Sequence, residues 1–152
     1  MRTFELNIFI DQPRNDVYDH VAEPINMIGL LPNLSSIDIL REQKSAVGIL
    51  TRPFYVLETF RWAGLPIYRN RVYTVIHLTR PKDELEFHVF SKPNIKIVFR
   101  YFFNEDEGKR THLIQRVNFE SVGRVLENFV FNHALNAQRA FLTNLKVRLE
   151  KS

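Results

Sequence analysis

The sequence predicts an α+β fold in which a curved, seven-stranded antiparallel sheet wraps around one long C-terminal helix. The segment 125–150 contains neither Pro nor Gly and repeats its apolar residues with a helical period. Between residues 37 and 121, apolar and polar residues alternate in short runs separated by turn residues, which is typical of strands. Such a sheet has one apolar face to cover, and only the final helix is long enough to cover it.

Length and composition place the chain among ordinary globular domains. It has 152 residues, of which 45% are hydrophobic and 25% charged, and we expect a single domain over 1–152. Phe is unusually frequent at 13 copies, and such bulky side chains line cores or apolar pockets. The chain contains no Cys, which excludes a disulfide framework, a thiolate metal site and a cysteine nucleophile.

Charge and hydropathy give no indication of a membrane or nucleic-acid role. The net charge is +4 without a block of Lys or Arg, so we expect no nucleic-acid partner. The first residues lack an apolar signal region and no apolar run reaches transmembrane length. We therefore expect a cytoplasmic protein without stable membrane insertion. The oligomeric state does not follow from these properties.

The N-terminal part predicts one strand followed by two short helices. Apolar residues occupy every second position from Phe4 to Ile10, the pattern of a half-buried strand. Pro13 then favours the start of a short helix, and Pro24 the start of a second one that continues to Leu31. These two helices lie between the first and second strands.

Six further strands follow, separated by turns. We expect the strands at 37–40, 47–63, 68–79, 85–91, 95–103 and 111–120, and turns at 64–66, 81–83, 93–94 and 104–110. Residues that face each other on neighbouring strands must share a face of the sheet. If the turn after Pro81 closes tightly, Ile76 lies opposite Phe87 and His77 lies opposite Glu86.

The next hairpin gives the same separation of faces. Closing the loop 104–110 puts Phe99 opposite Gln115 and Tyr101 opposite Leu113. Both hairpins then have one apolar and one charged face, which is typical of an antiparallel sheet with solvent on one side.

The hairpin at Gly64 has two possible arrangements. One turns Glu58 inward together with the large apolar residues Phe54, Val56, Phe60, Trp62 and Val72. The other turns inward three arginines, Arg61, Arg69 and Arg71. We favour the first arrangement because burying three cations costs more than burying one carboxylate.

The middle of the long helix carries small residues on its inward face. Ala134 and Ala137 lie between the larger Val130 and Phe141 on the apolar arc. Small residues either let the helix approach the sheet closely or leave room for a bound molecule. A solid core remains the alternative to a container, because 13 Phe side chains fill a large volume.

This order of elements resembles the START-like superfamily, also called the Bet v 1-like or polyketide cyclase/dehydrase-like group (SRPBCC), with its helix-grip fold. The resemblance covers essentially the whole chain. Its most particular stretches are Ile10–Tyr18, Pro32–Leu34 and the closing helix at Phe141–Glu150. It implies that an apolar or amphipathic small molecule or lipid is held between the sheet and the C-terminal helix. It also implies, as an alternative, an enzyme of the cyclase/dehydrase type that acts on a hydrophobic substrate there.

The strand faces and the helix arc together predict the residues of that cavity. We expect the ligand-binding residues to be Phe54, Val56, Phe60, Trp62, Asn70, Val72, Thr74, Ile76, Phe87, Phe99, Tyr101, Leu113, Gln115, Val130, His133, Ala134, Ala137 and Phe141.

Glu58 and His133 are the candidates for catalysis, if the protein is an enzyme. Glu58 is the one carboxylate placed inside, where a dry environment would raise its pKa and make it a general base. His133 lies at the edge of the apolar arc, where an imidazole serves as an acid, a base or a hydrogen-bond donor. A register shift of one residue would make Glu58 an ordinary surface glutamate.

We expect no cofactor and no metal. No nucleotide-binding or metalloprotease motif is present, and the five His residues lack ligand-like spacing. On the outer face, Arg61, Arg69 and Arg71 lie near Tyr55 and Tyr73. A solvated strand face explains this cluster, and an interaction with RNA, protein or an anionic lipid headgroup is the third functional hypothesis.

Overall fold

The computed structural model describes residues 2–62 and 65–151, and it describes side chains throughout these ranges except at 60–62 and 65–68. The helices are α1 (Arg14–Val21), the short 3-10 helix η1 (Pro24–Met27) and α2 (Glu127–Glu150). The strands are β1 (Thr3–Ile10), β2 (Leu34–Ile39), β3 (Gln43–Lys44), β4 (Leu50–Trp62), β5 (Leu65–Arg80), β6 (Glu84–Ser91), β7 (Ile95–Glu105) and β8 (Thr111–Ser121).

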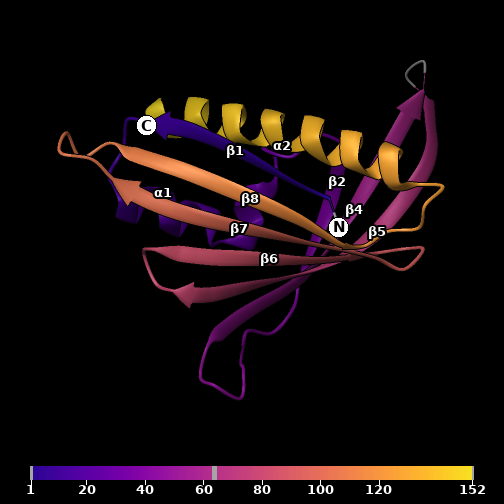
Figure 1. Ribbon diagram of the computed structural model, residues 1–152, viewed down its shortest axis with the longest axis horizontal. Helices are drawn as coiled ribbons and strands as arrows, with labels where there is room; N and C mark the ends of the chain where they lie inside the picture. Colours follow the sequence, from indigo (N-terminus) through magenta and orange to yellow (C-terminus); the bar gives the residue numbers. More distant parts are fainter. Residues whose placement is uncertain (1, 63–64, 152) are drawn as a thin grey trace.

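The predicted α+β fold is confirmed, with eight antiparallel strands in the described chain rather than seven. The sheet order is β1-β8-β7-β6-β5-β4-β2, with β3 paired to β4. The additional strand is β3, whose two residues are too few to show an alternating pattern. Figure 1 shows the strands fanned around α2, which runs alongside β1. None of the described helices is long and apolar enough to cross a membrane.

The hairpin between β5 and β6 forms as predicted. Ile76 pairs with Phe87, and His77 pairs with Glu86. The inward residues Ile76 and Phe87 are buried, whereas His77 and Glu86 on the outer face are only half-buried. One face of the sheet therefore forms the core and the other faces solvent.

The predicted register between β7 and β8 is wrong by two residues. Tyr101 pairs with Gln115 rather than with Leu113, and Phe99 pairs with Val117. The strands continue further than expected, because the Asp106 carboxylate accepts the main-chain N–H of Arg110 at 3.0 Å and closes a tighter turn. A slide of two residues keeps every side chain on its predicted face.

Several predicted boundaries also differ. Pro66 was expected in a turn, but it lies in β5 paired with Arg61; Gly64 lies outside the described residues. The second short helix ends at Met27 instead of continuing to Leu31. The long helix begins two residues after Val125, which is 95% exposed.

The two halves of α2 make different contacts with the rest of the fold. Its C-terminal half packs tightly: Phe141, Leu142 and Leu145 are at most 3% exposed. Helix α1 packs against β7, where the rings of Tyr18 and Phe103 lie 5.0 Å apart. The core is therefore solid at this end, and the N-terminal half of α2 faces the remaining part of the sheet.

Candidate functional site

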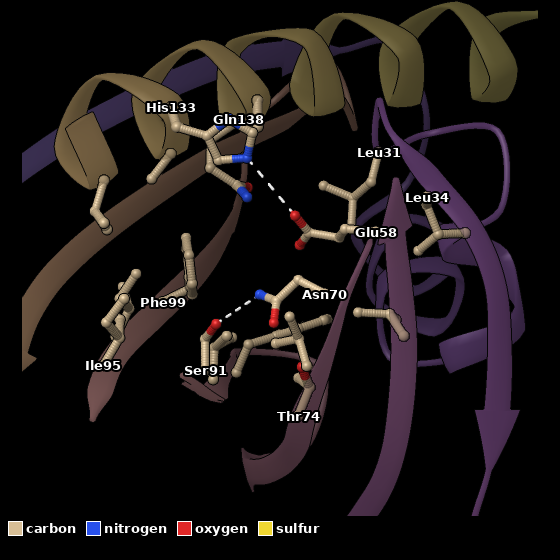
Figure 2. Close-up of a pocket in the computed structure, with 18 of the residues that line it drawn as sticks. Leu31, Leu34, Glu58, Asn70, Thr74, Ser91, Ile95, Phe99, His133 and Gln138 are labelled. Atoms are coloured by element: carbon tan, nitrogen blue, oxygen red, sulfur yellow. Dashed lines mark hydrogen bonds and ion pairs between the residues drawn. The ribbon is translucent and has the colours of Figure 1, made fainter. Parts of the chain in front are cut away.

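A cavity of about 600 Å³ lies between the N-terminal half of α2 and the inward faces of strands β4 to β7. Its wall is mostly apolar, with a small number of polar side chains pointing into it (Figure 2). Ligand pockets in proteins commonly enclose roughly 300–1,000 Å³ and have this composition. The sequence left open whether the interior is a solid core or encloses a cavity, and the structure has a cavity.

The small residues of α2 form the roof of this cavity. Ala134 and Ala137 both line it, as do the flanking Val130 and Phe141. The Phe141 ring contacts the Tyr101 ring with 6.2 Å between centroids and closes the cavity toward the solid core. Methyl side chains in the middle of the roof leave space that larger residues would fill.

The structure brings most of the predicted residues to the cavity wall. Those that line it are Phe54, Val56, Asn70, Val72, Thr74, Phe87, Phe99, Tyr101, Val130, His133, Ala134, Ala137 and Phe141, together with Glu58. That they bind a ligand stays a prediction. Phe60 and Trp62 belong to the part of β4 without described side chains.

Three predicted residues do not line the cavity. Ile76, Leu113 and Gln115 point inward but are completely buried. Alternation along a strand predicts which face a residue occupies, but not where along that face the helix packs directly on the sheet. Ile76 and Leu113 lie in the solid part of the core, and Gln115 lies behind the wall.

Glu58 and His133 face each other at the wet side of the cavity. His133 Nε2 lies 3.6 Å from Glu58 Oε2, and the two side chains are 30% and 27% exposed (Figure 2). The predicted inward orientation of Glu58 is therefore observed, but the carboxylate is not in the dry environment that the general-base hypothesis required. The arrangement places one carboxylate and one imidazole side by side on the cavity wall.

A second polar pair lies on the neighbouring strands. Asn70 pairs with Glu58 across β5 and β4, and its side-chain amide donates to Ser91 Oγ at 2.7 Å. Figure 2 shows both side chains on the wall opposite α2. These groups, with Thr74, give this part of the wall neutral hydrogen-bonding capacity.

A third polar group connects the sheet to the helix in the buried part of the wall. Gln115 Nε2 donates to Tyr101 Oη at 2.8 Å and to Gln138 Oε1 at 2.7 Å. These three residues are at most 8% exposed. Burial raises the pKa of Tyr101, and the hydrogen bond from Gln115 opposes this only in part, so the phenol keeps its proton.

Several wall residues were not predicted from the sequence, although signals for two were present. Gln138 lies four residues after Ala134 and three before Phe141, which places it on the inward arc. Ser91 lies four residues after Phe87 on the same strand face. The other cavity-lining residues that were not predicted are Met27, Leu31, Pro32, Leu34, Val89, Lys92, Pro93, Ile95, Ile97, Leu126 and Phe129. Among the described residues, no three His, Asp or Glu side chains are grouped so as to hold a metal ion.

Comparison with known proteins finds similarity in structure rather than in sequence. No protein-family model matches the chain, and no curated protein matches its sequence. The Zhui aromatase/cyclase from Streptomyces sp. R1128 superimposes with a TM-score of 0.77 at 14% identity, covering 99% of this chain and 94% of that one. A START superfamily protein from Mycobacterium smegmatis gives a TM-score of 0.72 at 13% identity over 98% and 97% of the two chains.

The chain has the START-like helix-grip fold. A further similar structure is the di-domain ARO/CYC BexL of the BE-7585A biosynthetic pathway, with a TM-score of 0.65 at 20% identity. This chain is covered to 98% but spans only 50% of that protein. The predicted resemblance to the START-like and polyketide cyclase-like group is therefore confirmed at the level of the fold. Identities this low carry no residue role from these proteins to this one.

Proposed function

We propose that this protein binds an apolar or amphipathic small molecule or lipid in the cavity between α2 and the sheet. The observation that carries the proposal is the cavity itself, about 600 Å³ in volume, apolar on most of its wall and continuous with solvent beside Glu58 and His133. Water gains little from occupying an apolar space of this size, whereas an apolar guest gains from leaving water. The START-like fold of the similar structures supports this proposal.

Two measurements test this function. Protein purified from cells is extracted with organic solvent, and the extract is examined by mass spectrometry for a stoichiometric apolar compound. Protein stripped in this way is then titrated with the apolar dye N-phenylnaphthylamine. We expect saturable fluorescence with about one site per chain; a linear, unsaturable increase would contradict a binding cavity. A cytoplasmic location remains part of the proposal.

A cyclase/dehydrase-like enzyme is the second candidate, and the Glu58–His133 pair is the observation that favours it. A carboxylate and an imidazole 3.6 Å apart on a cavity wall are suited to move a proton to and from a substrate carbon or oxygen. Two of the similar structures are named as aromatase/cyclase proteins. In this case the cavity also folds a flexible substrate before proton transfer.

The enzyme hypothesis is tested with a hydrophobic poly-β-ketone thioester as the probe substrate. Mass spectrometry follows loss of water from the probe, which accompanies ring closure and aromatisation. If Glu58 and His133 act as acid and base, Glu58→Gln and His133→Ala each lower the rate by about 100-fold or more. Turnover unchanged by either substitution would remove both residues from the catalytic role.

A further inference from the structure

The buried side chains of Tyr101, Gln115 and Gln138 leave hydrogen-bond donors directed at the cavity. Gln115 lies between the other two and contacts both through the same nitrogen, at 2.8 Å and 2.7 Å. Tyr101 and Gln138 line the cavity, whereas Gln115 does not. The inner amide, that of Gln115, therefore holds the side chains of Tyr101 and Gln138 next to each other on the cavity wall.

The hydrogen-bond directions show what this group offers to a guest. Because Gln115 donates to Tyr101 Oη, the phenol hydrogen remains available, and it has no acceptor among the described residues. Gln138 uses its oxygen toward Gln115, so its Nε2 is on the opposite side of the amide. Figure 2 shows the Gln138 side chain extending from α2 into the cavity. Two neutral donors, the Tyr101 hydroxyl and the Gln138 side-chain amide, therefore lie on neighbouring residues of the cavity wall.

The charge of the surroundings restricts the guest further. Among the described wall residues, only Lys92 is a permanent cation, and it is exposed at the β6–β7 turn. Tyr101 and Gln138 are 3% and 8% exposed, so an anion bound there would be buried without a countercharge. A neutral oxygen acceptor avoids that cost.

We propose that Tyr101 and Gln138 form a donor subsite that binds the neutral carbonyl oxygen of an otherwise apolar ligand, such as a ketone, an ester or an amide. This inference rests on the proposed binding function and specifies the ligand class. Gln115 is a positioning residue: its fully buried amide joins β8 to α2 and orients both donors. Its Nε2 contacts both wall groups, whereas its Oε1 is buried without a partner among the described residues.

Two dyes test the subsite separately from the cavity. Prodan is a naphthyl ketone whose emission shifts to the red when its carbonyl accepts a hydrogen bond. N-phenylnaphthylamine is apolar, of similar ring size, and has no carbonyl. The variants are Tyr101→Phe and Gln138→Met, which remove the donors and keep most of the volume. Tyr18→Phe is the matched control. The Tyr18 hydroxyl donates a hydrogen bond of 3.3 Å to the main-chain oxygen of Glu84, and Tyr18 does not line the cavity.

We expect each donor variant to raise the Kd of prodan by about 3- to 10-fold and to shift its bound emission to the blue. The Kd of N-phenylnaphthylamine should change by less than about twofold in both variants, and Tyr18→Phe should affect neither dye. Unchanged prodan binding and emission in both variants, or equal weakening of both dyes, would overturn the carbonyl subsite. If the wild type binds neither dye, the proposed function itself fails. Should Tyr101→Phe not fold, Gln138→Met decides alone.

Discussion

The guanidinium group of Arg148, near the C-terminal end of α2, donates a hydrogen bond to the main-chain oxygen of Asn26 at 2.7 Å. A second bond from the same side chain reaches the main-chain oxygen of Ile28 at 2.6 Å. The segment held in this way contains Met27 and leads to Leu31, and both residues line the cavity. The tightly packed end of the helix therefore also supports one side of the cavity.

Replacing Arg148 should weaken both the fold and the site. We expect Arg148→Ala to lower the free energy of unfolding by about 1–2 kcal/mol, because two main-chain carbonyls lose a charged donor while water replaces part of the interaction. Arg139→Ala is the control, since Arg139 is exposed on the same helix, and it should change stability by less than about 0.5 kcal/mol. Urea denaturation measures the free energy of unfolding of both variants. Equal effects of the two substitutions would show that the Arg148 contacts contribute nothing specific.

Strand alternation and turn residues were sufficient to predict the layers of the fold but not every register. The turn after Pro81 correctly placed Ile76 opposite Phe87. The same reasoning misplaced Tyr101 by two residues relative to β8, because a pattern with period two is unchanged by a slide of two residues. The turn geometry set by Asp106 decides that register, and it depends on a side-chain contact that periodicity does not contain.

Residues of the candidate site could be predicted from the sequence where knowing the face of the strand or helix that carries them was sufficient. Glu58 and Ala137 reach the cavity because strand parity and helix period both determine direction. Gln138 was not among the predicted residues, although its position in the helix, four residues after Ala134, is inward. Leu113 is completely buried and does not line the cavity, because periodicity does not show where α2 packs directly on the sheet.

Acidification should destabilise the protein in a window that begins near neutral pH. Burial, and then the charge of Arg148, lower the pKa of His20 below its ordinary value of 6.5. The unfolded chain therefore binds this proton at a higher pH than the folded chain does. The stabilisation is fully present above pH 6.5 and is lost as the pH falls from there toward the lower pKa of the folded state.

The variant His20→Gln keeps a hydrogen-bond acceptor near Arg148 and cannot titrate. We expect its stability to fall less than that of the wild type between about pH 7.5 and pH 5.5, measured by urea denaturation at several pH values. His77 contributes in the same direction, since burial and then His88 lower its pKa, and His77→Gln separates that contribution. If stability depends on pH identically in the wild type and both variants, neither His20 nor His77 is responsible for the loss of stability on acidification.

The basic outer face is expected not to bind nucleic acid. Arg71 lies over the Tyr55 ring at 4.0 Å and pairs with the Asp38 carboxylate at 3.7 Å, so its charge is partly compensated. Fluorescence anisotropy with a labelled single-stranded RNA at low salt should show no saturable binding. Salt-sensitive binding that weakens when Arg69 and Arg71 are both changed to Ala would instead support the interaction-module hypothesis.

Filling the roof of the cavity should remove ligand binding without unfolding the protein. Ala137 lines the cavity at the centre of the inward face of α2, one turn from Ala134 and Phe141. In Ala137→Phe the added ring enters empty or guest-occupied volume, so we expect near-unchanged thermal stability and loss of N-phenylnaphthylamine binding. In a solid core the same ring would overpack its surroundings and cost about 1–3 kcal/mol.

Asn136→Phe provides the matched control for Ala137→Phe. It adds the same ring to the adjacent position of the same helix, where the side chain is exposed. We expect this variant to bind the dye like the wild type, because its ring lies outside the cavity. Thermal melts with and without dye, run on both variants, separate the effect of filling the cavity from the effect of placing Phe in the helix. A strongly destabilised Ala137→Phe beside a wild type that binds no dye would show that the space under α2 does not accept a guest.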